Sequence, residues 1–174
     1  LAIDASRFLV GHPLMKAEER REFNQTLDEL RSRNVNLEPE LRANVQFILG
    51  RHAYEKDELE LANQQYVQSL SFWEGLSDRP MSISDLEKKA IVLLHLGLSY
   101  FRLADLRSTQ SRDYWQTARQ YFQSCIEVLD AANRRDLVSR FITYLSEVLR
   151  YLEAWKDLKY VVDRSLPLHQ KYGK

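Results

Sequence analysis

Apolar residues recur along this chain at intervals of three and four positions, the spacing that places them on one face of an α-helix. No stretch of useful length alternates apolar and polar residues as a half-buried strand does. Five Gly and four Pro also leave few turn residues for a protein of many strands. The pattern predicts an all-α fold of about seven helices, at approximately 13–32, 39–55, 57–75, 84–103, 113–131, 136–151 and 155–172.

Residues at the expected helix ends predict how the helices begin and stop. A capping residue followed three positions later by Glu or Gln can satisfy two free backbone N–H groups. Pro13 suits a first helical position, and Gly173 suits the C-terminal cap of the last helix. Loops are expected at 76–82 and 107–112. Capping pairs are predicted at Asp57 with Glu60, Ser84 with Glu87, and Asp113 with Gln116.

The helices fall into three antiparallel pairs that carry similar anchor residues. Small residues in both helices of a pair would let the two backbones approach closely, and an aromatic residue would fill the gap to the next pair. Such a pair cannot bury its apolar face alone, so neighbouring pairs are expected to stack. The anchors are Leu49-Gly50 with Ala62 and Tyr66, then Leu96-Gly97 with Ala118 and Phe122, then Leu145-Ser146 with Leu158 and Val162.

These anchors resemble the tetratricopeptide repeat, whose pattern is W-x2-L-G-x2-Y followed by A-x3-F. The second pair matches best, because Tyr100 also follows its Leu-Gly anchor at the expected distance. The resemblance implies a right-handed superhelical array of antiparallel helix pairs, a tetratricopeptide-like α-solenoid. Its pairs would occupy 37–76, 83–131 and 135–172, after an N-terminal segment and packing helix over 1–36.

The chain departs from the family pattern in several places. Successive anchors lie 47 and 49 residues apart, from Gly50 to Gly97 and on to Ser146, instead of 34. Leu158 stands where a small residue is expected, and Gln46 replaces the first Trp of the pattern. We therefore expect an irregular member with long repeats. Another kind of long-repeat helical array, or a compact helical bundle, is the competing fold.

Composition and charge narrow the classes of function. Lys plus Arg and Asp plus Glu both number 25, so the chain carries no net charge, and no nucleic-acid or membrane-surface partner is expected. No apolar run approaches the roughly 20 residues of a membrane span. The single thiol, Cys125, excludes an intramolecular disulfide and favours a cytoplasmic setting. Because the chain begins at Leu1 instead of Met, we expect a domain of a larger protein.

Motifs that would carry catalysis or hold a cofactor are missing from the sequence. Its glycines never cluster into a phosphate-binding loop, and its four histidines form no zinc or di-iron signature. His52 and Glu55 could share a helix face, but a solvated or capping role is the favoured interpretation. Cys125 lies seven residues after Ala118, where an inert core thiol is expected. We predict no enzyme, no metal and no cofactor.

Several aromatic residues could form a stacking platform for nucleic-acid bases. They fall on second helices of the pairs or at the starts of those helices, where packing against the next pair is the favoured role. These residues are Trp73, Tyr114, Trp115, Tyr121 and Trp155.

In the tetratricopeptide family the first helix of each pair lines a concave groove that takes a peptide. The resemblance therefore implies a partner-binding groove lined by residues spaced along the first helices. These residues are Asn44, Phe47, Arg51 and Tyr54 in the first pair, Ile91, Leu94, Leu98, Phe101 and Arg102 in the second, and Arg140, Thr143, Glu147, Arg150 and Tyr151 in the third.

Arginines give this groove a basic bias that suits acidic side chains or a C-terminal carboxylate. Phe47 and Arg51 stand where the carboxylate clamp of chaperone-binding members has Lys and Asn, so chaperone tails are not expected. The alternative is a solvated face on which the arginines pair with local partners such as Glu55 and Glu147.

The first helix of the second pair is apolar nearly all round, and such a helix is buried. Its groove side must be covered by the N-terminal helix, by a second copy of the chain or by the partner. We predict a protein- or peptide-binding module of a larger protein. The alternative is a structural self-association domain, such as a homodimer, or an intramolecular scaffold in a multidomain regulator.

Overall fold

The structure is a computed structural model that describes residues 38–76 and 80–173, with positions 21, 25, 26, 28, 29 and 32 before them. Six α-helices and one short 3-10 turn make up the regular structure of residues 38–173, and no described residue lies in a strand. The all-α prediction is confirmed. Of the helix expected at 13–32, Pro13 and most other positions lie outside the described residues.

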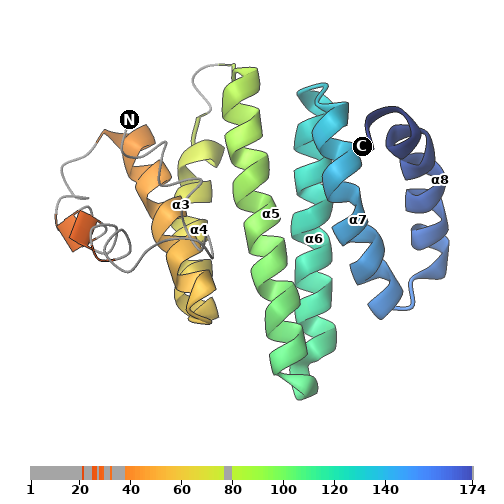
Figure 1. Ribbon diagram of the computed structural model, residues 1–174, viewed down its shortest axis with the longest axis horizontal. Helices are drawn as coiled ribbons and strands as arrows, with labels where there is room; N and C mark the ends of the chain where they lie inside the picture. Colours follow the sequence, from red (N-terminus) through yellow and green to blue (C-terminus); the bar gives the residue numbers. More distant parts are fainter. Residues whose placement is uncertain are drawn as a thin grey trace. The chain divides into compact units, whose positions relative to one another are not determined.

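Two helices of the first unit, Leu1–Ser77, form a hairpin: α3 (Pro39–Glu55) and α4 (Leu59–Glu74) (Figure 1). The proline stands at the first helical position of α3, where its missing N–H costs nothing. Val45 and Ile48 of α3 are buried, as are Tyr66 and Trp73 of α4. The hairpin therefore has its own apolar interior.

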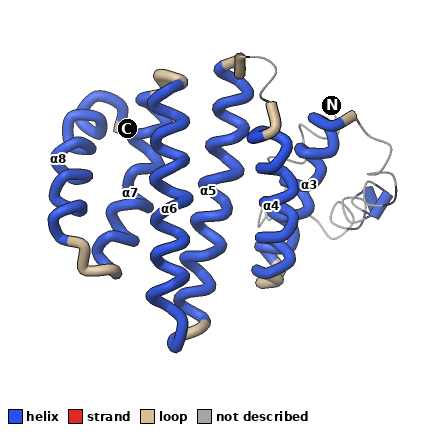
Figure 2. The backbone as a smooth tube through the Cα atoms, turned by 180° about the vertical axis from the view of Figure 1, so that it is seen from behind, coloured by secondary structure: helices blue, strands red, loops and turns tan. Residues whose placement is uncertain are grey.

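The second unit, Asp78–Lys174, contains four helices that lie side by side in chain order (Figures 1 and 2). Each helix packs against the next one along the chain. Its elements are α5 (Ile83–Leu106), the 3-10 turn η2 (Ser108–Gln110), α6 (Ser111–Ala131), α7 (Arg135–Tyr151) and α8 (Trp155–Tyr172).

The predicted close approach between paired helices occurs at both anchor glycines. A β-carbon on Gly50 would lie 2.6 Å from the ring of Tyr66, and one on Gly97 would lie 2.4 Å from the ring of Phe122. Both rings are buried, so each pair closes over a position that has room only for hydrogen. Phe122 also stacks on Tyr144 of α7, with 5.8 Å between ring centroids, and in this way fills the gap to the next helix.

The third pair lacks this arrangement. Ser146 stands at the anchor position, and its Oγ donates a hydrogen bond to the carbonyl of Ile142 at 3.2 Å. Val162, at the position of the aromatic residue, is 47% exposed. A different feature is common to all three pairs: the residue seven positions after the second anchor is small and buried, as Ser69, Cys125 and Ser165 show.

Three of the helix connections use the same three-residue turn, at 56–58, 132–134 and 152–154. The middle residue has a left-handed backbone in each, with φ of 63° at Asp57, 54° at Asn133 and 56° at Glu153. The N–H of the following residue returns to a carbonyl five positions back, as Ala154 does to Leu149 at 2.9 Å. This is the Schellman ending of a helix, formed here without glycine.

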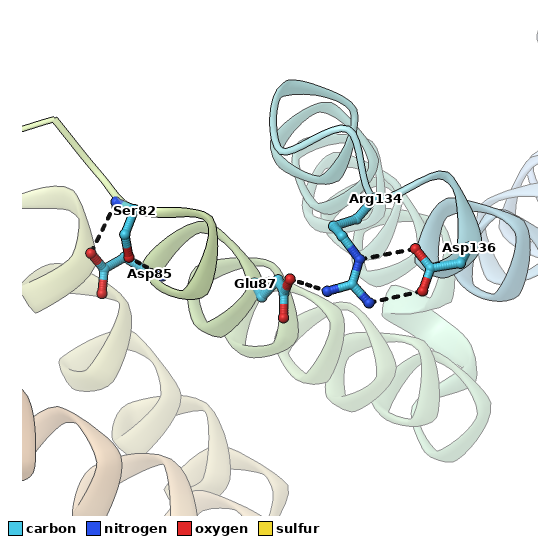
Figure 3. A network of polar contacts seen from close by, with 5 residues as sticks. All are labelled: Ser82, Asp85, Glu87, Arg134 and Asp136. Atoms are coloured by element: carbon cyan, nitrogen blue, oxygen red, sulfur yellow. Dashed lines mark hydrogen bonds and ion pairs between the residues drawn. The ribbon is translucent and has the colours of Figure 1, made fainter.

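The predicted capping pairs are wrong. Asp57 is the left-handed residue of a turn, and α4 has Glu58 as its N-cap, with no side-chain capping bond. For α5 the capping box lies two residues earlier than Ser84: Ser82 and Asp85 exchange side-chain and backbone hydrogen bonds of 3.1 Å (Figure 3). The carboxylate of Asp85 accepts this backbone hydrogen bond as well as a Glu carboxylate would. Ser84, the predicted capping residue, therefore lies inside the helix.

At the start of α6 the expected loop contains a 3-10 turn, and the helix begins two residues before Asp113. Gln110 is the N-cap and makes no side-chain capping bond. At the other end of the chain, Gly173 is the C-cap of α8, and its N–H donates to the His169 carbonyl at 2.8 Å. That part of the capping prediction is confirmed.

Arg134 connects the start of α7 to α5. Its guanidinium donates two hydrogen bonds to the carboxylate of Asp136, at 2.8 and 2.9 Å, and a third to Glu87 (Figure 3). A planar guanidinium matches a carboxylate in this two-point geometry. Glu87, which was predicted to cap α5, is thus engaged with Arg134 and lies beyond the first turn of the helix. The hydrogen bonds from Arg134 also lower the pKa of Asp136 to about 2 from its ordinary value of 3.8.

Candidate functional site

The predicted groove residues of the first unit lie on α3. Asn44, Arg51 and Tyr54 are half-buried, while Phe47 is only 6% exposed and lies 5.8 Å from the ring of Tyr66. Arg51 forms an ion pair of 3.5 Å with Glu55, one helical turn further on.

The remaining predicted groove residues lie on α5 and α7 of the second unit. On α5, Leu94 is 7% exposed, while Ile91, Leu98, Phe101 and Arg102 are half-buried. The apolar prediction for this helix is therefore confirmed at its centre, where Leu93 and Leu96 are also buried. On α7 the predicted residues are exposed, namely Arg140, Thr143, Glu147, Arg150 and Tyr151.

Three of the predicted groove residues, Phe101, Arg150 and Tyr151, meet in an aromatic cluster around Tyr151, the last residue of α7. Its ring meets Phe101 of α5 edge-on at 5.5 Å and stacks on Trp115 of α6 at 4.9 Å between centroids. The guanidinium of Arg150 lies 4.5 Å from the same ring. We call these four residues the Tyr151 cluster. It joins three helices and leaves Tyr151 37% exposed.

Packing and charge hold the Tyr151 ring in one place. Each aromatic pair contributes about 0.5–1.5 kcal/mol beyond the area that it buries. A guanidinium over an exposed ring adds roughly 0.5–1 kcal/mol. The exposed edge of Tyr151 is therefore already ordered, and a partner that touched it would not have to immobilise it.

Two of the four predicted groove arginines, Arg51 and Arg150, have the local carboxylate partners that the alternative interpretation predicted. Besides the pair of Arg51 and Glu55, Arg150 lies 3.6 Å from Glu147, with about half of each side chain exposed. Exposed pairs of this kind contribute little, typically below about 1 kcal/mol. Burial raises the pKa of Glu55, although the charge of Arg51 opposes the shift. Such weak pairs can be exchanged for a partner's carboxylate at small cost.

Sequence reasoning missed a polar hollow of about 440 Å³ between α6 and the turn from α7 to α8. The signal was present in the sequence, because polar residues recur at 112, 116, 119, 120 and 123, along one face of α6. Arg119 crosses from this face to Asp157 of α8 with a hydrogen bond of 2.9 Å. The hollow is lined by Arg112, Gln116, Arg119, Gln120, Gln123, Leu152 and Ala154.

The other aromatic residues serve different purposes. Tyr121 stacks on Tyr100 within its own pair, at 5.6 Å, and Tyr114 lies 6.2 Å from the same ring. Burial raises the pKa of Tyr100, and neighbouring Tyr114 adds to the shift. Trp73 is buried at 2% exposure, whereas Trp155 is 61% exposed. The prediction of packing against a next pair is therefore wrong for Tyr114 and Tyr121, which contact Tyr100 of their own pair. For Trp155 it stays a prediction, because no helix pair follows α8 among the described residues.

Cys125 is 1% exposed, and burial raises the pKa of its thiol to about 12, so it is inert at neutral pH. Among the described residues no group of three His, Cys, Asp or Glu side chains converges as metal ligands would. None of the described helices combines the length and the apolar character needed to cross a membrane.

Comparison with known proteins finds a similarity to a far longer protein. The chain is 30% identical, over 139 residues, to an uncharacterised WD repeat-containing protein of Synechocystis sp.. The match covers 76% of this chain but only 8% of the length of that protein. WD repeats are built of strands, whereas no described residue of this chain lies in a strand. No family model and no solved structure matches the chain.

Proposed function

We propose that this chain is a tetratricopeptide-like helical module of a longer protein, and that it binds a protein or peptide at the surface of α5 and α7 in the second unit. The observation that carries the proposal is the Tyr151 cluster. Tyr, Trp and Arg are the residues enriched at the centres of protein interfaces, where a few side chains supply most of the binding energy. The cluster brings all three types together beside the exposed face of α7.

The side chains of the Tyr151 cluster are already held in place before a partner binds, and this favours binding. Association costs about 0.5–1.5 kcal/mol for each flexible side chain that the interface immobilises. Tyr151 is already immobilised by its stack with Trp115 and its edge contact with Phe101, so binding does not add this cost. Tyr151 therefore presents a rigid anchor to an incoming chain.

Charge favours an acidic partner. Arg140 and Arg150 are exposed on α7, and Glu147 is the carboxylate that lies near Arg150. A guanidinium binds carboxylates through charge-assisted hydrogen bonds, which are about twice as strong as neutral ones. Basic side chains at the rim of an interface also accelerate association with an acidic chain. We therefore expect peptides rich in Asp and Glu to bind best.

Two observations support the family assignment and the longer protein. The glycine-to-aromatic contacts of the first two pairs repeat the same device at Gly50 and Gly97. The matched protein of Synechocystis sp. is far longer than this chain and carries WD repeats by its name. We propose that the chain is likewise one helical segment of a larger protein, where the module recruits a partner.

An arrayed peptide library tests the proposal across many candidate sequences at once. Wild-type chain should retain acidic peptides, and Arg140→Glu with Arg150→Glu should weaken their binding at least tenfold. The matched control is Lys156→Glu with Lys171→Glu, which makes the same change of charge at exposed positions of α8. Equal loss in both variants would reveal a general charge effect. An array that selects no peptide would contradict the proposed function.

A further inference from the structure

The last helix matches α6 at four positions of similar character, each 40 residues further along the chain. Trp115 of α6 corresponds to Trp155 of α8, and the buried Cys125 corresponds to the buried Ser165. Two more apolar positions follow the same register: Phe122 corresponds to Val162, and Ile126 to Leu166. The two helices therefore present comparable faces, and what covers one face predicts what fits the other.

On α6 this face is covered by α7. Trp115 stacks on Tyr151 at 4.9 Å, and Phe122 stacks on Tyr144 at 5.8 Å. Phe122, whose ring also lies against Gly97 of α5, is 2% exposed, and Ile126 is 3% exposed. The two tyrosines lie seven residues apart on α7, so one side of that helix meets the α6 face over two turns.

On α8 the corresponding face is open. Trp155 is 61% exposed, Val162 47% and Leu166 58%. Their spacing of seven and four residues places them along one stripe, to the side of Val161 and Ser165, which are buried. The end of a helical array normally carries a polar outer face, because an apolar one would remain in contact with water. We call Trp155, Val162 and Leu166 the α8 stripe.

We propose that the α8 stripe is a docking surface for an amphipathic helix of the α7 type, belonging to a further helix pair that stacks on α8 as α7 stacks on α6. The register fixes what this helix must offer: aromatic or large apolar side chains seven residues apart, opposite Trp155 and Val162. Lys159 and Asp163 flank the stripe and form an ion pair of 2.7 Å. Charged side chains therefore border the apolar positions on one side. This surface differs from the α5 and α7 surface proposed above to bind the partner.

A synthetic peptide of residues 135–151, with a fluorescent label, is the probe because its sequence is that of α7. Added to the full chain, it should bind saturably, and the signal is fluorescence polarisation. The variant Val162→Asp with Leu166→Asp should weaken binding at least tenfold. Both positions are exposed, so the variant should keep the helical circular dichroism of the wild type. A peptide carrying Tyr144→Ala and Tyr151→Ala should bind as weakly to the wild-type chain.

Every outcome decides the proposal. Loss of binding in the stripe variant and in the altered peptide supports it. The proposal is overturned if the peptide does not bind saturably to the wild-type chain, or if it binds equally to the wild-type chain and to the stripe variant. A second copy of the chain is the alternative occupant of the α8 stripe, and sedimentation equilibrium of the chain alone tests for it. If the wild-type chain is a dimer and the Val162→Asp with Leu166→Asp variant is a monomer, the stripe binds a second copy and the proposed helix is overturned.

Discussion

The ring of Phe122 lies so close to Gly97 that a β-carbon on the glycine would come within 2.4 Å of Cε1. The ring is 2% exposed and also stacks on Tyr144, so it cannot turn aside into open space. Gly97 is therefore needed for the approach of α5 to α6 and not for an unusual backbone conformation. The contact connects three consecutive helices through one aromatic side chain.

Gly97→Ala should lower the free energy of unfolding. Overpacking costs about 1–3 kcal/mol, which exceeds the roughly 1 kcal/mol that alanine gains over glycine in helix propensity. Urea unfolding followed by circular dichroism measures the difference. In a Phe122→Leu background the same change should be neutral or stabilising, because the smaller side chain leaves room for the methyl group.

Gly75→Ala is the matched control for that experiment, because Gly75 ends α4 in ordinary helical backbone and its added β-carbon would lie 3.2 Å from the nearest atom. Its effect should stay within about 0.5 kcal/mol. A stabilised Gly97→Ala variant would show that α5 and α6 are not packed closely at this position.

Glu153→Gly should stabilise the fold. Glu153 has a φ of 56° in the turn between α7 and α8, and a left-handed backbone costs a residue with a side chain about 1–2 kcal/mol. Glycine avoids this cost but loses more chain entropy on folding, so the net gain should be about 0.5–1 kcal/mol. Thermal unfolding measures it. Asn133→Gly should gain less, since Asn tolerates this conformation, and a destabilised Glu153→Gly would contradict the turn geometry.

Asp136→Asn should destabilise the fold at neutral pH and lose this effect in acid. Hydrogen bonds from Arg134 lower the folded-state pKa of Asp136 to about 2, below the ordinary value of 3.8. The carboxylate therefore contributes fully above pH 3.8 and ceases to contribute as the pH falls through about 2. Because the pair is partly exposed, the difference at pH 7 should be about 0.5–1 kcal/mol. Urea unfolding at pH 7 and pH 2.5 should show a smaller difference in unfolding free energy between the wild type and the variant at the lower pH. An equal difference at both values would show that the carboxylate charge does not cause the destabilisation.

Much of the fold could be predicted from the sequence, because apolar residues recur at helical spacing and the lengths of the helices follow from that spacing. The bounds of α3, and those of α8 with its Gly173 cap, were predicted to the residue. α8 was predicted although Pro167 lies inside it and breaks one backbone hydrogen bond, which shows tertiary packing outweighing a local preference. The Gly50 and Gly97 contacts were predictable because a small residue opposite an aromatic one marks close packing.

The turns and the capping residues could not be predicted in the same way. Asp, Asn and Glu occupy left-handed positions where glycine is the usual signal, so Asp57 was interpreted as a cap. Ser82 and Ser84 are both followed at three positions by a carboxylate, and only the packing of the helix selects the first.

The candidate site depends on contacts between helices that no local pattern encodes. Sequence reasoning placed Phe101 and Tyr151 on one groove, but it assigned Trp115 to packing alone. The polar hollow was missed, since its lining joins α6 to a turn some thirty residues away along the chain.

Site-specific photo-crosslinking tests the central claim most directly. A photoreactive residue at Thr143, exposed on α7 between Arg140 and Glu147, should form an adduct with the acidic peptides that the array selects. The same residue at Glu127, exposed on α6, is the control and should form none. Adducts at position 143 that excess unlabelled peptide abolishes are the predicted result. Equal adducts at both positions, or adducts at 127 alone, would contradict a partner-binding surface on α5 and α7.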